Sequence, residues 1–251
     1  MPLRFTAPPR IDDRLVERSF TLDGIDGILW TPESIPEPAP LILLGHPGGL
    51  APMHPRLAAR ARSAAAMGFA AAALELPGAG GRTPLPDADL ARAELRQAIM
   101  SGGRPTDETV DRLVLPLVEQ AVPEWQAAID ALLDLPEIGG PVGVSGGVIS
   151  IGVRLAAVEP RVVAAGLFAG SWIPRATLDE ARRVTIPVHV LLQWDDEGND
   201  RQQALDLFDA FGSAEKTLNA NLGGHTGVPA WAADDAGRFF TRHLTRSHPR
   251  G

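Results

Sequence analysis

The length and composition are those of a single globular domain. The chain has 251 residues, of which 45% are hydrophobic and 22% charged, and its formal net charge is −8. The absence of cysteine excludes disulfides, thiolate metal sites and a cysteine nucleophile. The acidic balance, with no basic run, argues against a nucleic acid or an anionic membrane as partner. No apolar segment approaches the roughly 20 residues of a membrane-spanning helix, and no apolar signal core follows Met1, so we expect a cytoplasmic protein.

The order of the predicted elements indicates the fold class. The first 40 residues predict two short strands, 19–22 and 27–30, joined by a turn. Further along the chain, we expect strands at 41–44, 69–76, 141–144, 162–168, 188–192 and 216–221, and helices at 56–67, 125–133, 148–158, 204–211 and 232–244. This alternation predicts an α/β fold, with a mostly parallel central sheet and helices on both faces, over one domain of residues 1–251.

Residues 82–119 do not fit this alternation. Leu90, Leu95 and Ile99 have helical spacing, but the pattern is broken at 101–105. Two interpretations are open, a long crossover helix with an irregular end and an insertion that caps a pocket.

The segment 143–147 reads Gly-Val-Ser-Gly-Gly, which fits the pattern G-x-S-x-G between a predicted strand and a predicted helix. In this context a sharp turn holds the serine in a strained backbone conformation and exposes its hydroxyl at the carboxyl edge of the sheet. The N–H of the next residue, Gly146, then points to where an oxyanion would form. Ser145 is therefore a candidate nucleophile. The alternative is a glycine-rich turn in which Ser145 only caps the helix.

A serine nucleophile needs a base and an acid that orients the base. His225 lies in a glycine-flanked loop after the last predicted strand, and Asp195 and Asp196 follow the strand 188–192. The chain order of serine, aspartate and histidine is that of the α/β-hydrolase fold. Either aspartate fits this order.

These motifs resemble those of the α/β-hydrolase superfamily and, within it, the dienelactone-hydrolase-like serine esterases. The resemblance runs from about residue 20 to residue 245 and rests on the segments 45–49, 75–80 and 143–147 and on the two loops that hold the acid and the histidine. It implies hydrolysis of a carboxylic ester, lactone or thioester of a small to medium substrate through a Ser145–His225–Asp196 triad and an acyl-enzyme.

The resemblance also bears on the acid and on the oxyanion hole. It favours Asp196 over Asp195 as the acid, although the hydrophobic-proline segment that usually follows the aspartate is replaced here by 197–200. Family members commonly have glycine where this chain has Pro47, and proline lacks an N–H. The oxyanion donors are therefore expected to be Gly48 and Gly146.

Other side chains at the same edge are candidates for substrate binding. They are His46, Trp172, Trp194, Leu115 and Leu117. The motifs imply a small-molecule substrate and no cofactor or metal. Two alternatives are open, a lyase or cyclase that uses the same residues on a biosynthetic intermediate and a binding module that has lost activity. The sequence predicts neither the substrate nor the oligomeric state.

Overall fold

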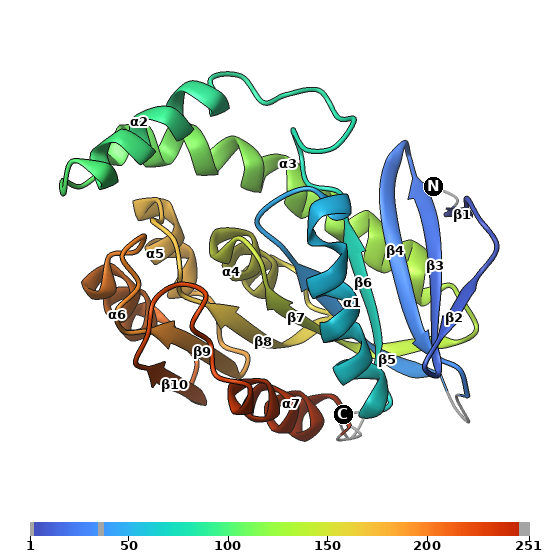
Figure 1. The fold of residues 1–251 in the computed structure, drawn as a ribbon. Helices are drawn as coiled ribbons and strands as arrows, with labels where there is room; N and C mark the ends of the chain where they lie inside the picture. The colour runs from blue at the N-terminus through green and yellow to red at the C-terminus, as the bar shows by residue number, and fades with distance from the viewer. Residues whose placement is uncertain (1–2, 35–37, 246–251) are drawn as a thin grey trace.

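A ten-stranded sheet forms the centre of the molecule (Figure 1). The computed structural model describes residues 3–34 and 38–245. The strands are β1 (Arg4–Phe5), β2 (Arg10–Asp12), β3 (Leu15–Leu22), β4 (Ile25–Pro32), β5 (Ala39–Gly45), β6 (Ala70–Leu74), β7 (Ile138–Gly146), β8 (Val162–Phe168), β9 (Val188–Gln193) and β10 (Lys216–Asn221). Their order is β1-β3-β4-β6-β5-β7-β8-β9-β10, with β2 paired to β3. Strands β5 to β10 are parallel, and the N-terminal strands pair antiparallel.

Helices cover both faces of this sheet, which confirms the predicted fold class (Figure 1). They are α1 (Leu50–Ala66), α2 (Ala88–Met100), α3 (Asp107–Leu133), α4 (Ile149–Val158), α5 (Arg175–Ala181), α6 (Arg201–Ala210) and α7 (Trp231–Leu244). Helices α1 and α7 lie on one face, α3 and α4 lie on the other, and α2 packs against α3. None of the helices within the described residues is long and apolar enough to cross a membrane.

The apolar run at the centre of β5 explains why both faces are covered. Leu41 and Leu43 are buried in the core cluster that includes α3 and α4, whereas Ile42 and Leu44 are buried in the cluster that includes α1 and α7. Successive side chains of a strand point to opposite faces, so an unbroken apolar run needs helices on both sides.

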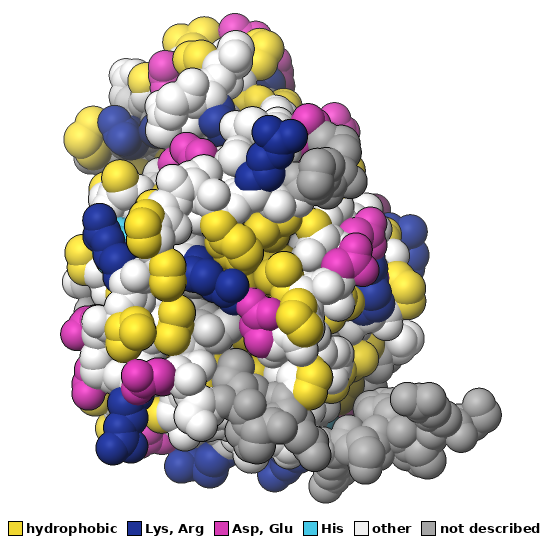
Figure 2. Space-filling view, turned by 90° about the vertical axis from the view of Figure 1, so that its right-hand side faces the viewer, with side chains coloured by type: hydrophobic (Ala, Val, Ile, Leu, Met, Phe, Trp, Pro, Cys, Tyr) yellow, Lys and Arg dark blue, Asp and Glu magenta, His cyan; other side chains and the backbone are white. Residues whose placement is uncertain are grey.

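The N-terminal strands are joined by tight turns. Asp13 and Arg14 between β2 and β3, and Asp23 and Gly24 between β3 and β4, all have positive φ angles, as two-residue type I′ hairpin turns require. Strands β3 and β4 are longer than predicted, and the short exposed strands β1 and β2 were not predicted. Figure 2 shows this side of the molecule, where hydrophobic side chains gather between basic and acidic ones.

The segment that broke the alternation forms two helices. The predicted break at 101–105 is the connection between α2 and α3. Helix α3 is a single 27-residue helix that continues through Pro116 and Pro123. The sequence predicts a separate helix at 125–133 and, for 82–119, either a long crossover helix with an irregular end or an insertion that caps a pocket. Thr106 caps α3 by accepting a hydrogen bond from the backbone N–H of Thr109.

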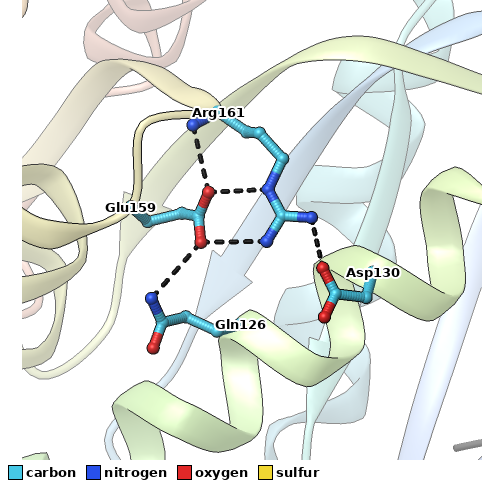
Figure 3. A network of polar contacts seen from close by, with 4 residues as sticks. All are labelled: Gln126, Asp130, Glu159 and Arg161. Atoms are coloured by element: carbon cyan, nitrogen blue, oxygen red, sulfur yellow. Dashed lines mark hydrogen bonds and ion pairs between the residues drawn. The ribbon is translucent and has the colours of Figure 1, made fainter.

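A polar network joins α3 to the turn between α4 and β8 (Figure 3). The Glu159 carboxylate accepts hydrogen bonds from Arg161 Nε at 2.6 Å and Nη2 at 2.9 Å, and from Gln126 Nε2 at 3.4 Å. Arg161 also contacts Asp130 of α3. The hydrogen bonds from Arg161 hold the pKa of Glu159 below its usual value, and those to Glu159 and Asp130 raise the pKa of Arg161.

The first prediction concerns this network. Replacing Arg161 by methionine leaves the Glu159 carboxylate, whose side chain is 3% exposed, without its main donor. We expect the free energy of unfolding at pH 7 to fall by about 1–3 kcal/mol. Because the folded-state pKa of Glu159 is depressed, the stabilisation is present above the ordinary glutamate pKa of about 4.3 and is lost as the pH falls through the folded-state value.

Urea unfolding between pH 7 and pH 3 measures the difference between wild type and variant, which should narrow on acidification. Arg62→Met is the control, because Arg62 pairs with Asp12 at an exposed site. This substitution should lower the free energy of unfolding by less than about 1 kcal/mol. Equal losses of unfolding free energy for the two variants would contradict the stabilising role of this network.

Candidate active site

Two loops at the carboxyl edge of the sheet are tied to each other. They follow the neighbouring parallel strands β9 and β10. The N–H of Trp194 donates to the carbonyl oxygen of Asn221 at 2.7 Å, and the N–H of Asp195 donates to that of Gly223 at 3.2 Å. The loop that carries His225 is therefore held against the acidic loop.

His225 and Asp196 form a hydrogen-bonded pair between these loops. His225 Nδ1 lies 2.7 Å from Asp196 Oδ2, and the Asp196 side chain is 1% exposed. The other carboxylate oxygen accepts from the N–H of Gly198 at 3.0 Å, and the ring of Phe168 meets the imidazole edge-on, with centroids 5.3 Å apart. A carboxylate accepts, so Nδ1 carries the proton and Nε2 of the neutral ring is left as an acceptor.

Asp195 has a different position. Its side chain accepts a hydrogen bond from the N–H of Gly223 at 3.3 Å, and the residue is exposed. It therefore supports the backbone of the histidine loop, and Asp196 is the carboxylate that contacts the ring of His225.

The turn after β7 departs from the sequence prediction. Ser145 is the last residue but one of β7. The positive φ angles of the turn fall at Gly146 (64°) and Gly147 (84°) and not at Ser145, which corrects the prediction that the serine itself is strained. Both positions suit glycine. At Gly147 a Cβ would also lie 2.6 Å from Cα of Gly45, so only glycine allows the ends of β5 and β7 to approach this closely.

The register of β7 determines where Ser145 points. Gly143 is two residues earlier and shares its face of the sheet. A Cβ at Gly143 would lie 3.0 Å from Phe240 of α7. The Ser145 side chain is therefore on the face covered by α1 and α7.

Arg60 of α1 meets Ser145 on that face. Its Nη2 donates to Ser145 Oγ at 3.1 Å and to the Ser145 carbonyl oxygen at 2.5 Å, and its Nη1 donates to the carbonyl oxygen of Gly45 at 2.7 Å. Within the described residues no hydrogen bond joins Ser145 to His225. The serine hydroxyl is thus held by an arginine that the sequence analysis did not identify.

Arg60 also takes up the space beside Gly146. A Cβ at Gly146 would lie 2.9 Å from Arg60 Nη2. Burial, together with the neighbouring charge of Arg56, lowers the pKa of Arg60 to about 10, so the guanidinium is still protonated at neutral pH. Its position, inside a helix and four residues after Arg56, offers no sequence signal that distinguishes it from a surface arginine.

The loop of the predicted oxyanion donor Gly48 is fixed by a buried carboxylate. Glu75 follows β6 and accepts hydrogen bonds from the N–H of Leu50 at 3.1 and 3.2 Å, which anchors the first turn of α1. His46 is buried beside this loop, and its Nε2 lies 2.8 Å from the carbonyl oxygen of Leu74. Burial lowers the pKa of His46, so the ring is neutral at pH 7.

Several of these groups line one large cavity of about 840 Å³. It is lined by Gly48, Ser145, Gly146, His225, Trp172 and Leu117 of the predicted site. Leu115, Trp194 and His46 are not among its lining residues within the described chain. Trp194 is 37% exposed, and Arg201 lies over its ring, with Cζ 4.4 Å from the ring centroid.

The cavity reaches beyond the loops. Leu113 and Val114 of α3 and Leu95 of α2 line one part, and residues of α1 and α7 line another. Within the described residues no group of three or more His, Cys, Asp or Glu side chains is placed to hold a metal ion.

Comparison with known proteins identifies the class of the fold. No family model and no curated sequence matches the chain. Among solved structures, a cold-adapted esterase from an Arctic intertidal metagenomic library has a TM-score of 0.73 and 27% identity, over 96% of this chain and 99% of the other.

Two other neighbours are more distant in sequence. Acetyl xylan esterase 1 from Thermoanaerobacterium has a TM-score of 0.64 and 15% identity, over 96% of this chain and 87% of the other. Dienelactone hydrolase from Anabaena variabilis has a TM-score of 0.59 and 18% identity, over 94% and 99%. The chain is thus an α/β-hydrolase-fold protein that resembles the dienelactone-hydrolase-like esterases, and its similarity to the Arctic esterase supports the predicted class of enzyme, a carboxylic ester hydrolase.

The second prediction concerns the glycine turn at the end of β7. Gly146→Ala adds a Cβ at a positive φ, which costs about 1–2 kcal/mol, and that Cβ must also displace Arg60. Gly102→Ala changes a residue with positive φ and open space around it, and Gly81→Ala changes one with open space and no positive φ.

The free energy of unfolding, measured with urea, should therefore fall most for Gly146→Ala and less for Gly102→Ala, and should stay close to the wild-type value for Gly81→Ala. A loss at Gly146 no larger than that at Gly102 would show that the contact with Arg60 does not constrain the turn.

Proposed function

We propose that the protein hydrolyses carboxylic esters, lactones or thioesters of small to medium substrates, with Ser145 as nucleophile, His225 as base and Asp196 as the residue that orients the base. The observation that carries the proposal is the pair of His225 and buried Asp196, hydrogen-bonded at 2.7 Å beside a cavity that Ser145 also lines. The 27% identity to an esterase over nearly the whole of both chains supports it.

The proposed reaction follows from the chemistry of these groups. Ser145 Oγ attacks the carbonyl carbon, while Nε2 of His225 accepts the hydroxyl proton and then delivers it to the leaving group. The N–H groups of Gly48 and Gly146 stabilise the oxyanion. His225 then deprotonates a water molecule, which attacks the acyl carbon. The bond from this carbon to Ser145 Oγ breaks, the acid is released, and His225 returns the proton to Ser145 Oγ.

The contact between Arg60 and Ser145 sets a condition on this mechanism. Arg60 donates to the hydroxyl oxygen, so the hydroxyl proton stays available for a base. The hydroxyl has no hydrogen bond to His225 among the described residues, and the mechanism therefore requires one of these two side chains to move when an ester binds. The His225 side chain is 47% exposed, which leaves it room to do so.

We further propose that α2 and the first part of α3 cap the substrate. Leu95, Leu113 and Leu117 of these helices line the cavity. Arg104, in the connection between the helices, contacts Asp200 at the start of α6, which ties the cap to the acidic loop. An apolar cap suits the hydrocarbon part of an ester.

One observation favours a second candidate, a binding protein without hydrolytic activity. In a G-x-S-x-G turn the nucleophile is the residue with the strained backbone. Here the positive φ angles are at Gly146 and Gly147, which have no side chain to act as nucleophile. Arg60 also occupies the space beside Gly146. Such a protein would keep the cavity and its polar rim but would form no acyl-enzyme.

The third prediction separates these two candidates. A fluorophosphonate probe reacts with an activated serine, so it should label the wild type once, at Ser145, and should not label Ser145→Ala. Intact-protein mass spectrometry and peptide mapping measure the labelling. Ser63→Ala is the control, because Ser63 also lines the cavity but lies on α1. The binding-protein candidate predicts that no serine of the wild type is labelled.

The fourth prediction separates the adjacent carboxylates. Asp196→Asn replaces a carboxylate that can only accept by an amide that can also donate to Nδ1, so the imidazole tautomer is no longer fixed. This change should lower kcat for a nitrophenyl ester by up to about 10⁴-fold. Asp195→Asn should change kcat by less than about 10-fold, because within the described part of the chain the Asp195 side chain bonds only to the loop backbone. Steady-state kinetics of both variants measures these changes in kcat. Comparable losses of kcat would mean that catalysis depends on the backbone of the loop and not on the contact between Asp196 and the imidazole.

A further inference from the structure

Arg60 is a cation without an anionic partner. Its three hydrogen bonds go to two backbone carbonyl oxygens and to the Ser145 hydroxyl, and it forms no ion pair with any described residue. A guanidinium has five N–H donors, so two have no hydrogen-bond partner among the residues that the structure describes. Cations that proteins withdraw from water are normally paired with an anion.

The surroundings of Arg60 add positive charge. Arg56 precedes it by one helical turn and lines the same cavity. The carboxylate of Glu75 already accepts the N–H groups of Leu50 and Leu76 and has no hydrogen bond to Arg60 among the described residues. This end of the cavity therefore favours an anion.

Beyond Arg60 the cavity lining on this side is mostly apolar, apart from Ser63. Ala64 of α1 and Met67, the residue that follows the helix, lie at helical spacing from Arg60 and also line the cavity. Opposite them, α7 contributes Ala232 and Ala236, whose small side chains leave room between the two helices. The cavity lining thus changes from Arg56 and Arg60 to a mostly apolar part. We call the part lined by Ala64, Met67, Ala232 and Ala236 the hollow.

We infer that this part of the cavity binds an amphipathic monocarboxylic acid, with its carboxylate on Arg60 and its hydrocarbon chain along Ala64 and Met67, between α1 and α7. The free N–H groups of the guanidinium donate to the carboxylate oxygens, and the Ala-lined hollow takes up the chain. This binding goes beyond the proposed hydrolysis and does not depend on it, because the acid is held without a covalent bond.

Isothermal titration calorimetry with dodecanoate, carried out on the Ser145→Ala protein, tests this site apart from any hydrolysis. Dodecanoate should bind at least about 10-fold more tightly than dodecan-1-ol, because only the acid carries the charge that Arg60 recognises. Arg60→Gln should weaken dodecanoate binding by about 10-fold or more. Arg92→Gln is the matched control, since Arg92 lines the cavity from α2, and should change the affinity by less than about 3-fold.

Because Arg60 also holds the ends of two strands, folding of Arg60→Gln is checked by circular dichroism. Ala236→Leu provides an independent variant, which narrows the hollow without touching the arginine. It should weaken binding of dodecanoate and leave binding of acetate unchanged. The inference is overturned if dodecan-1-ol binds as well as dodecanoate, if Arg92→Gln matters as much as Arg60→Gln, or if Ala236→Leu binds dodecanoate like the wild type.

Discussion

The geometry of the site depends on one interaction, the hydrogen bonds that Arg60 of α1 makes to the ends of β5 and β7. The guanidinium bridges the carbonyl oxygens of Gly45 and Ser145, which belong to adjacent parallel strands. It can lie there because the turn beside it is built from glycines, so that no Cβ stands between helix and strand. These hydrogen bonds hold α1 against the sheet. They also place the positive charge of Arg60 next to Ser145, at the carboxyl ends of β5 and β7.

The second constraint is the connection between the two loops after β9 and β10. Backbone hydrogen bonds join them, and the buried Asp196 carboxylate holds His225 through Nδ1. His225 and the Ser145 hydroxyl, with Arg60 beside it, line the same cavity. The proposed hydrolysis requires an ester bound in this cavity to contact both Ser145 and His225.

Much of the fold follows from the sequence because unbroken apolar strands alternate with amphipathic helices from residue 41 onward. The pairing of His225 with an acidic loop could be predicted as well, since both loops follow neighbouring parallel strands. The side of the sheet to which Ser145 points could not, because a shift of one residue in strand register turns a side chain to the opposite face. Arg60 was missed because its role depends on the packing of α1. The continuity of α3 was missed because helical spacing was followed only over 125–133, whereas the helix begins at Asp107 and includes Pro116 and Pro123.

The proposed role of Ser145 as nucleophile can be tested with a crystal structure of the protein after reaction with an alkyl phosphonate ester. If Ser145 is the nucleophile, the electron density will be continuous from Ser145 Oγ to phosphorus, with the phosphoryl oxygen facing the N–H groups of Gly48 and Gly146 and the alkyl chain in the cavity. An unmodified Ser145 with the phosphonate bound intact in the cavity, or an adduct on another residue, would contradict it.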